Sequence, residues 1–213
     1  TAARYLGADI LSGFTVSNLL YDKPWWIVTD IHGNTIRARH LILTMGAFFG
    51  DVGNFDELTD MFTRKRMQYM ATKPLETRLP PFAIMDVDGT NSIRSHQERV
   101  IYGMDANDED IADLKNNQST LNVMKGRLTY RLHCAHDTEL QPEFTWSRNI
   151  LATPDGLPII AHFESLPNIY LNMGYNEHSL SYQMIGGRII AGLVKNGQYD
   201  IPGSKIFSME RMQ

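Results

Sequence analysis

Two segments far apart in the chain each carry an apolar run that ends in a glycine turn. One spans residues 39–47 and contains Gly46, and the other runs through 168–173 to Gly174. A helical pattern of apolar residues follows at 178–195. Glycine lets a backbone approach a flat ligand, and a helix N-terminus carries about half a positive charge that would stabilise negative charge on that ligand. The alternative is a routine strand–turn–helix unit, in which Asn176 caps the helix.

Other groups of reactive side chains give weaker indications. His133 and His136 flank Cys134, which suggests a metal site, but two further ligands at suitable spacing are missing. The hydroxyl of Ser179 lies next to His178, without the sharp glycine elbow that activates a serine nucleophile. We therefore expect neither a bound metal nor a nucleophilic serine.

The elements that would position these residues follow from the sequence pattern. Residues 2–6 indicate a helix that ends at Gly7, and residues 9–20 indicate a strand, a turn at Gly13 and a second strand. Strands at 25–29 and 35–39 would form a hairpin, and the run at 41–44 is typical of a strand buried on both faces. The middle of the chain predicts a helix followed by strands at 67–72, 82–86, 90–95 and 98–102, and then a surface helix at 108–123.

Composition limits the partners that we expect. The chain has 213 residues, a net charge of -4 and a single cysteine, Cys134. The negative charge gives no reason to expect nucleic acid or an anionic membrane as a partner, and one cysteine excludes an internal disulfide. Because no apolar run reaches about 18 residues, we predict a cytoplasmic protein. The chain begins without methionine inside a predicted helix, which we interpret as a fragment.

An ordered set of landmarks resembles the second half of the FAD-dependent oxidoreductases of the D-amino-acid oxidase, glycine oxidase and sarcosine oxidase family. The set includes Leu-Thr-Met-Gly-Ala at 43–47, Thr-Lys-Pro-Leu at 72–75, Trp146, Thr-Pro-Asp-Gly-Leu-Pro at 153–158 and Gly-Tyr at 174–175. The resemblance implies FAD as cofactor, with Val16 near the adenine and Thr44, Gly46 and Ala47 in the dinucleotide crevice. It also implies that the isoalloxazine ring faces Gly174, Tyr175, Asn176, Glu177, His178 and Ser179.

Three departures from the family pattern matter. No G-x-G-x-x-G phosphate-binding motif occurs in the 213 residues, so we expect this chain alone to bind FAD weakly or not at all. Glu177 and Ser179 stand where the family has glycines, so either Glu177 turns outward to solvent or the flavin site is altered. Ile150 stands where related amino-acid oxidases have a substrate-binding arginine. No cysteine follows Cys134, so we expect the flavin of the intact protein to be non-covalent.

Several residues are candidates for contact with a substrate. Arg148 lies two residues from Ile150 and on the same face of a strand, so it either replaces the missing arginine or is a solvated surface residue. Arg94 stands where the family often has an arginine near the substrate, with simple surface exposure as the alternative. Tyr69 could offer a hydroxyl, with packing as the alternative. His178 is either a flavin contact or a histidine of the cap region.

We therefore predict an α/β fold of mixed α+β character with two lobes. An incomplete Rossmann-like FAD-binding lobe would comprise 1–52 and 147–213, and an antiparallel-sheet substrate lobe would comprise 53–146. The predicted reaction of the intact protein is oxidation of a C–N bond of a small-molecule amine or amino acid by hydride transfer to flavin. The alternatives are a non-catalytic binding or assembly module, or one subunit of a split flavoenzyme. In the latter, a partner polypeptide or a missing N-terminal half would carry the phosphate-binding loop.

Overall fold

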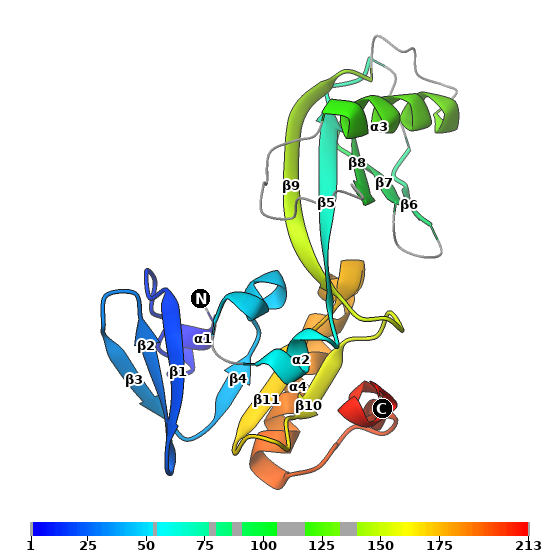
Figure 1. Cartoon of the computed structure of the whole chain (residues 1–213). Coiled ribbons are helices and arrows are strands. Elements are labelled where there is room, and N and C mark those ends of the chain that lie inside the picture. The colour runs from blue at the N-terminus through cyan, green and yellow to red at the C-terminus, as the bar shows by residue number, and fades with distance from the viewer. Residues whose placement is uncertain are drawn as a thin grey trace.

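The protein has two lobes joined by a pair of long strands, as the computed structural model in Figure 1 shows. The structure describes residues 2–52, 55–76, 80–86, 91–105, 118–132 and 140–212. Helices and strands are mixed, and most strand pairs are antiparallel. This architecture confirms the predicted fold class.

The N-terminal part of the lower lobe is an antiparallel sheet of β1 (Val16–Asp22), β2 (Trp25–Asp30) and β3 (Thr35–Ala38). The carboxylate of Asp30 closes the β2–β3 turn by accepting hydrogen bonds from the backbone N–H groups of His32 and Asn34, at 2.9 and 2.8 Å. This confirms the predicted hairpin, and α1 (Ala2–Tyr5) confirms the first helix. The strand predicted before Gly13 is wrong, because Ile10 and Leu11 stay exposed and gain none of the burial that favours a strand.

A second sheet in the lower lobe contains β10 (Ile159–His162), β11 (Ile169–Met173) and β4 (Leu41–Leu43), in that order. β4 and β11 pair in parallel, with Leu43 opposite Leu171, so both strands end at the same edge. Helix α4 (Ser179–Asn196) packs on this sheet through Ile189 and Ile190. The predicted strands at 41–44 and 168–173 and the helix at 178–195 are confirmed. Burial of β4 on both faces is wrong, since Ile42 is 43% exposed at the rim of the sheet.

The upper lobe is a five-stranded antiparallel sheet with the order β6-β7-β8-β5-β9. Its strands are β5 (Thr63–Thr72), β6 (Ala83–Met85), β7 (Asn91–His96), β8 (Arg99–Asp105) and β9 (Pro142–Ala152). Helix α3 (Gln118–Arg131) buries Leu121, Met124 and Leu128 in one cluster with Met70 and Tyr102 of the sheet. The helix predicted at 108–123 is therefore confirmed from residue 118, and it continues to residue 131. Residues 108–117 lie outside the described part of the chain.

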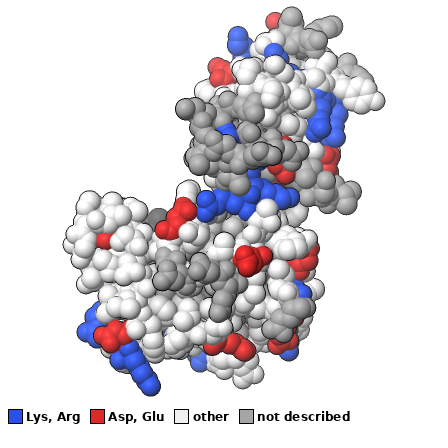
Figure 2. All heavy atoms as spheres, viewed as in Figure 1, with Lys and Arg blue, Asp and Glu red and all other residues white. Residues whose placement is uncertain are grey.

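Strands β5 and β9 join the two lobes. They pair along their length, from Thr63 opposite Ala152 to Thr72 opposite Pro142. Figure 2 shows Lys and Arg atoms concentrated where the lobes meet, with Asp and Glu atoms nearby, and Arg64 at the start of β5 pairs with Asp51 at 3.1 Å. The predicted domain boundary at residue 146 falls inside β9, so the division into domains stays a prediction.

Short helical segments complete the described chain: η1 (Gly46–Asp51), α2 (Asp56–Thr59), η2 (Asn176–His178), η3 (Ser204–Phe207) and η4 (Met209–Met212). The guanidinium of Arg211 fixes the C-terminal segment by donating to the Asp155 carboxylate at 2.5 Å and to the Leu157 carbonyl at 2.7 Å. Within the described ranges, no helix combines the length and apolar character that a membrane span requires. The described residues also contain no cluster of metal-binding side chains, and residues 133–136 lie outside them.

Adjacent glycines in α4 provide a matched test of helix packing. A Cβ atom at Gly186 would collide with the Tyr175 hydroxyl and lie 2.8 Å from Asn172 Oδ1, whereas one at Gly187 would meet nothing within 4 Å. Gly186→Ala should therefore lower the free energy of unfolding, because overpacking costs about 1–3 kcal/mol and outweighs the gain of about 0.5–1 kcal/mol in helix propensity. Gly187→Ala should raise it by about 0.5–1 kcal/mol, because alanine favours the helix. Urea unfolding of both variants measures the difference, and equal effects would contradict the packing described.

Candidate functional site

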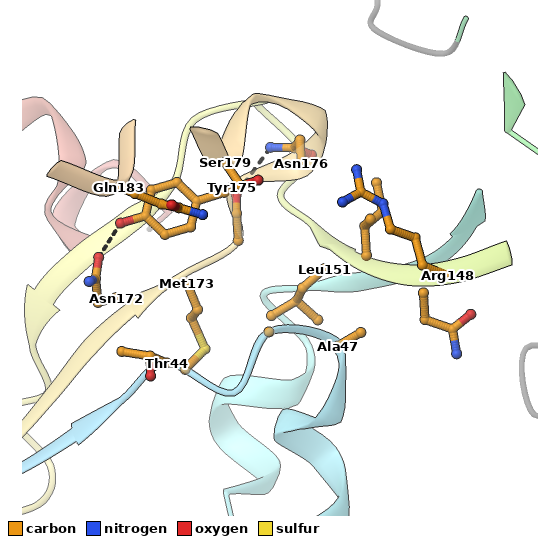
Figure 3. Close-up of a pocket in the computed structure, with 14 residues that line it drawn as sticks. Thr44, Ala47, Arg148, Leu151, Asn172, Met173, Tyr175, Asn176, Ser179 and Gln183 are labelled. Atoms are coloured by element: carbon orange, nitrogen blue, oxygen red, sulfur yellow. Dashed lines mark hydrogen bonds between the residues drawn. The ribbon is translucent and has the colours of Figure 1, made fainter. Parts of the chain in front are cut away.

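The ends of β4 and β11 open onto one pocket of about 370 Å³ (Figure 3). Gly46 follows β4 and Gly174 follows β11, so the two glycine turns noted in the sequence share this cavity. The pocket is lined by Thr44, Gly46, Ala47, Arg148, Asn149, Ile150, Leu151, Asn172, Met173, Gly174, Tyr175, Asn176, Ser179 and Gln183.

The turn after β4 presents backbone rather than a bulky side chain to the pocket. Gly46 has a φ of 56°, in the left-handed region that favours glycine. A Cβ atom there would meet nothing within 4 Å. The 3-10 helix η1 begins at this glycine and buries Ala47 and Phe49. Together with Thr44, these residues leave a short open stretch of chain beside the cavity.

The lack of a side chain at Gly174 allows Phe62 and Thr153 to pack closely against its backbone. Its φ is 75°, and a Cβ atom would lie 2.8 Å from both Phe62 Cε1 and Thr153 Cγ2. The next turn is held by Asn176, whose amide donates to the Gly174 carbonyl at 3.1 Å and whose Oδ1 accepts from the Thr153 N–H at 3.3 Å. The prediction that Asn176 caps α4 is therefore wrong. Asn176 lies in η2, and His178 precedes α4 without a side-chain capping bond.

Tyr175 forms one side of the pocket, with Ser179 and Gln183 beside it on the first turns of α4 (Figure 3). Its hydroxyl donates a hydrogen bond to the Asn172 side chain. Burial raises the pKa of Tyr175 to about 12. The phenol is therefore neutral at physiological pH, and it can position a neighbouring group but not act as a base.

A cluster of Tyr69, Arg148 and Glu177 lies beside the pocket, where β5, β9 and η2 meet. Arg148 donates through Nε to the Tyr69 hydroxyl at 3.0 Å and through Nη2 to the two Glu177 oxygens at 3.1 and 3.3 Å. Tyr69 donates to the same carboxylate at 3.0 Å. The Glu177 side chain is only 12% exposed. An outward turn of Glu177 to solvent is therefore wrong, because Arg148 and Tyr69 compensate its charge within the fold.

The ring of Tyr69 is held on two sides. Trp146 stacks on it with ring centroids 5.4 Å apart and an interplanar angle of 6°, and the Arg148 Cζ atom lies 5.2 Å from the ring centroid. Gly103 on β8 leaves room for the ring, since a Cβ atom there would lie 2.5 Å from it. Burial, and then the charge of Glu177, raise the pKa of Tyr69 above its usual value. Its hydroxyl therefore stays protonated and donates to Glu177.

The structure does not bring every predicted residue to the pocket. Val16 begins β1 in the hairpin sheet and Arg94 is exposed on β7, and neither lines the cavity. Glu177 and His178 lie in η2 but are not lining residues either. Ile150, where the resemblance led us to look for an arginine, lines the pocket and is buried. The roles predicted for these residues stay predictions.

Several lining residues were not predicted from the sequence. Asn172 and Met173 end the strand before Gly174, so the predicted strand could have identified them. Gln183 lies four residues after Ser179, on the same face of α4, which helical spacing could have indicated. No comparable sequence pattern identifies Asn149 as a lining residue.

The lining residues determine what the pocket could hold. Ala47, Ile150, Leu151 and Met173 form apolar surface, while amides and hydroxyls supply hydrogen-bonding groups. The described lining contains no carboxylate, and Arg148 is its one cation. Such a set fits a flat heteroaromatic ring with a polar edge. It fits the ring system of a flavin better than a diphosphate, because Glu177 already engages Arg148.

Tyr69 provides a test of the charged cluster. Tyr69→Phe keeps the stacked ring but removes the hydroxyl that bonds Arg148 and Glu177, so the free energy of unfolding should fall by about 1–3 kcal/mol. The matched control is Tyr5→Phe, because Tyr5 is 92% exposed and its hydroxyl should contribute less than about 0.5 kcal/mol. Urea unfolding followed by circular dichroism measures both. Wild-type stability of Tyr69→Phe would show that the cluster does not form.

Comparison with known protein families agrees with this arrangement. The profile of the family DAO, described as FAD dependent oxidoreductase, matches residues 1–193. The bifunctional protein ThiO/ThiG from Nostoc sp. is 23% identical over 201 residues, which make up 93% of this chain and 29% of that protein.

Solved structures share the fold. L-Proline dehydrogenase from P. horikoshii superposes with a TM-score of 0.77 at 19% identity, over 99% of this chain and 56% of that one. Glycine oxidase from Geobacillus kaustophilus gives 0.76 at 14% identity, over 97% and 54%. The chain therefore spans about half the length of these structures and less than a third of the curated relative. Because the profile covers most of its residues, the chain belongs to the DAO family of FAD-dependent oxidoreductases.

Proposed function

We propose that this chain supplies the flavin-facing and substrate-facing part of an enzyme that oxidises a C–N bond of a small amine or amino acid. The observation that carries the proposal is that Gly46 and Gly174 line the same pocket. FAD is the cofactor of the family. The names of two structural neighbours, glycine oxidase and L-proline dehydrogenase, support an amine or amino acid as the substrate class.

The residues around the pocket would hold the ring end of the cofactor. In Figure 3, Tyr175 and Ser179 lie across the pocket from Thr44 and Ala47. The open backbone at Gly46 allows close approach to a flat ring. The N-terminus of α4 would add partial positive charge beside it.

Bound FAD would supply the acceptor for the hydride that leaves the substrate carbon. The chain itself orients the reactants and excludes water, through the apolar surface of Ile150, Leu151 and Met173. Tyr175 stays protonated and positions its neighbours by hydrogen bonds. The described lining offers no carboxylate base, which agrees with a reaction that needs little acid–base help.

A complete enzyme also needs a group that binds the diphosphate of FAD. No G-x-G-x-x-G motif occurs in these 213 residues. We propose that a further segment of a longer protein, or a partner polypeptide, supplies that loop.

The glycines replaced by Glu177 and Ser179 suggest a second candidate, a non-catalytic binding module. The position of Glu177 argues against it, because its carboxylate lies against Arg148 and Tyr69 and does not line the pocket. Ser179 adds only a small hydroxyl to the lining. These positions support the catalytic proposal.

Flavin titration tests the proposal. Because the lining fits the ring and offers little to a diphosphate, FAD should bind the 213-residue chain no more than about tenfold more tightly than riboflavin does. Quenching of flavin fluorescence measures both affinities. Much tighter binding of FAD would contradict the fit described, and no binding of riboflavin would contradict the proposed function.

A pair of glycine variants locates the binding site. Gly46→Ala should weaken riboflavin binding by about tenfold, since the added methyl group enters open space at the pocket. Gly33→Ala is the matched control. It carries a similar backbone strain, with a φ of 83° and nothing within 4 Å of its Cβ position, but it lies in the β2–β3 turn. Equal losses in both variants would place the flavin elsewhere.

A further inference from the structure

We propose that Glu177 sets the substrate class of this site. By engaging the guanidinium of Arg148, it disfavours substrates with a free carboxylate and favours amines that lack one. The inference rests on the proposed function and extends it to the substrate. Arg148 is the one cation among the described residues that line the pocket. It is therefore the group that a substrate carboxylate would bind there.

Arg148 is 47% exposed, but its hydrogen bonds go to side chains of the protein. Its Nε bonds the Tyr69 hydroxyl, and its Nη2 bonds both oxygens of Glu177. A carboxylate binds a guanidinium most strongly through two N–H groups. A ligand carboxylate would have to share Arg148 with Glu177, and the close approach of two carboxylates is unfavourable.

The fold holds Glu177 in this position more firmly than a ligand could be held. Tyr69 bonds both members of the ion pair, and its own ring is stacked on Trp146. The Glu177 side chain is 12% exposed, so the carboxylate is already desolvated, whereas a free ligand loses translational freedom when it binds. An amine that lacks a carboxylate leaves the ion pair of Arg148 and Glu177 intact.

Two probes that differ by one carboxylate, benzylamine and phenylglycine, test the inference on the 213-residue chain without flavin. The Nε–H signal of Arg148 in a ¹H–¹⁵N NMR spectrum reports on the guanidinium during each titration. The wild-type chain should bind benzylamine about tenfold more tightly than phenylglycine, and phenylglycine should not shift the Arg148 signal. This comparison needs no variant.

Variants separate the role of Glu177 from general charge effects. Glu177→Gln should raise the affinity for phenylglycine by about tenfold and allow it to shift the Arg148 signal. Combining Glu177→Gln with Arg148→Gln should remove that gain. Glu164→Gln is the matched control, because Glu164 is exposed and does not line this pocket. It should leave both affinities unchanged.

Three results would overturn the inference: equal wild-type affinity for the two probes, a shift of Arg148 by phenylglycine in the wild type, or no change in Glu177→Gln. If neither probe binds while riboflavin does, the substrate assignment fails and the flavin proposal stands. If the probes behave as expected while riboflavin does not bind, the flavin proposal fails instead.

Discussion

The parallel pairing of β4 with β11 is the constraint on which the site depends. Residues 41–43 of β4 lie opposite residues 169–171 of β11. Two segments that are far apart in the sequence therefore end side by side, at the carboxyl ends of the two strands. The carboxyl ends of parallel strands are where α/β proteins place their ligands. Gly46 and Gly174 follow these two ends, and α4 starts just beyond the second. Loss of this pairing would separate the walls of the pocket.

The ion pair of Arg148 with Glu177 ties this edge to the upper sheet. Removing Arg148 would leave the Glu177 carboxylate, whose side chain is 12% exposed, without its charged partner, and such an unpaired charge costs more than an intact pair contributes. The same pair neutralises the one cation of the described lining. The ion pair of Arg148 and Glu177 thus connects the two lobes and compensates the positive charge of Arg148 beside the pocket. Because the carboxylate of Glu177 lies outside the pocket lining, it does not obstruct the pocket.

Local patterns predicted much of the lower lobe, because the hairpin turn, the apolar runs before Gly46 and Gly174, and the stripe of α4 are encoded by neighbouring residues. β9 was not predicted as a strand along its length, since its burial depends on pairing with β5. The partners of Glu177 could not be predicted either, because Arg148 and Tyr69 lie 29 and 108 residues away. The cap assigned to Asn176 failed for the same reason, as Thr153 competes for its side chain.

A crystal structure of the chain soaked with riboflavin would test the central claim most directly, namely that two distant glycine turns form the walls of one flavin pocket. The account predicts electron density for the ring between the backbone at Gly46 and that at Gly174, with Glu177 still paired to Arg148. A ring bound at another surface, or the two glycines on separate faces of the molecule, would contradict it.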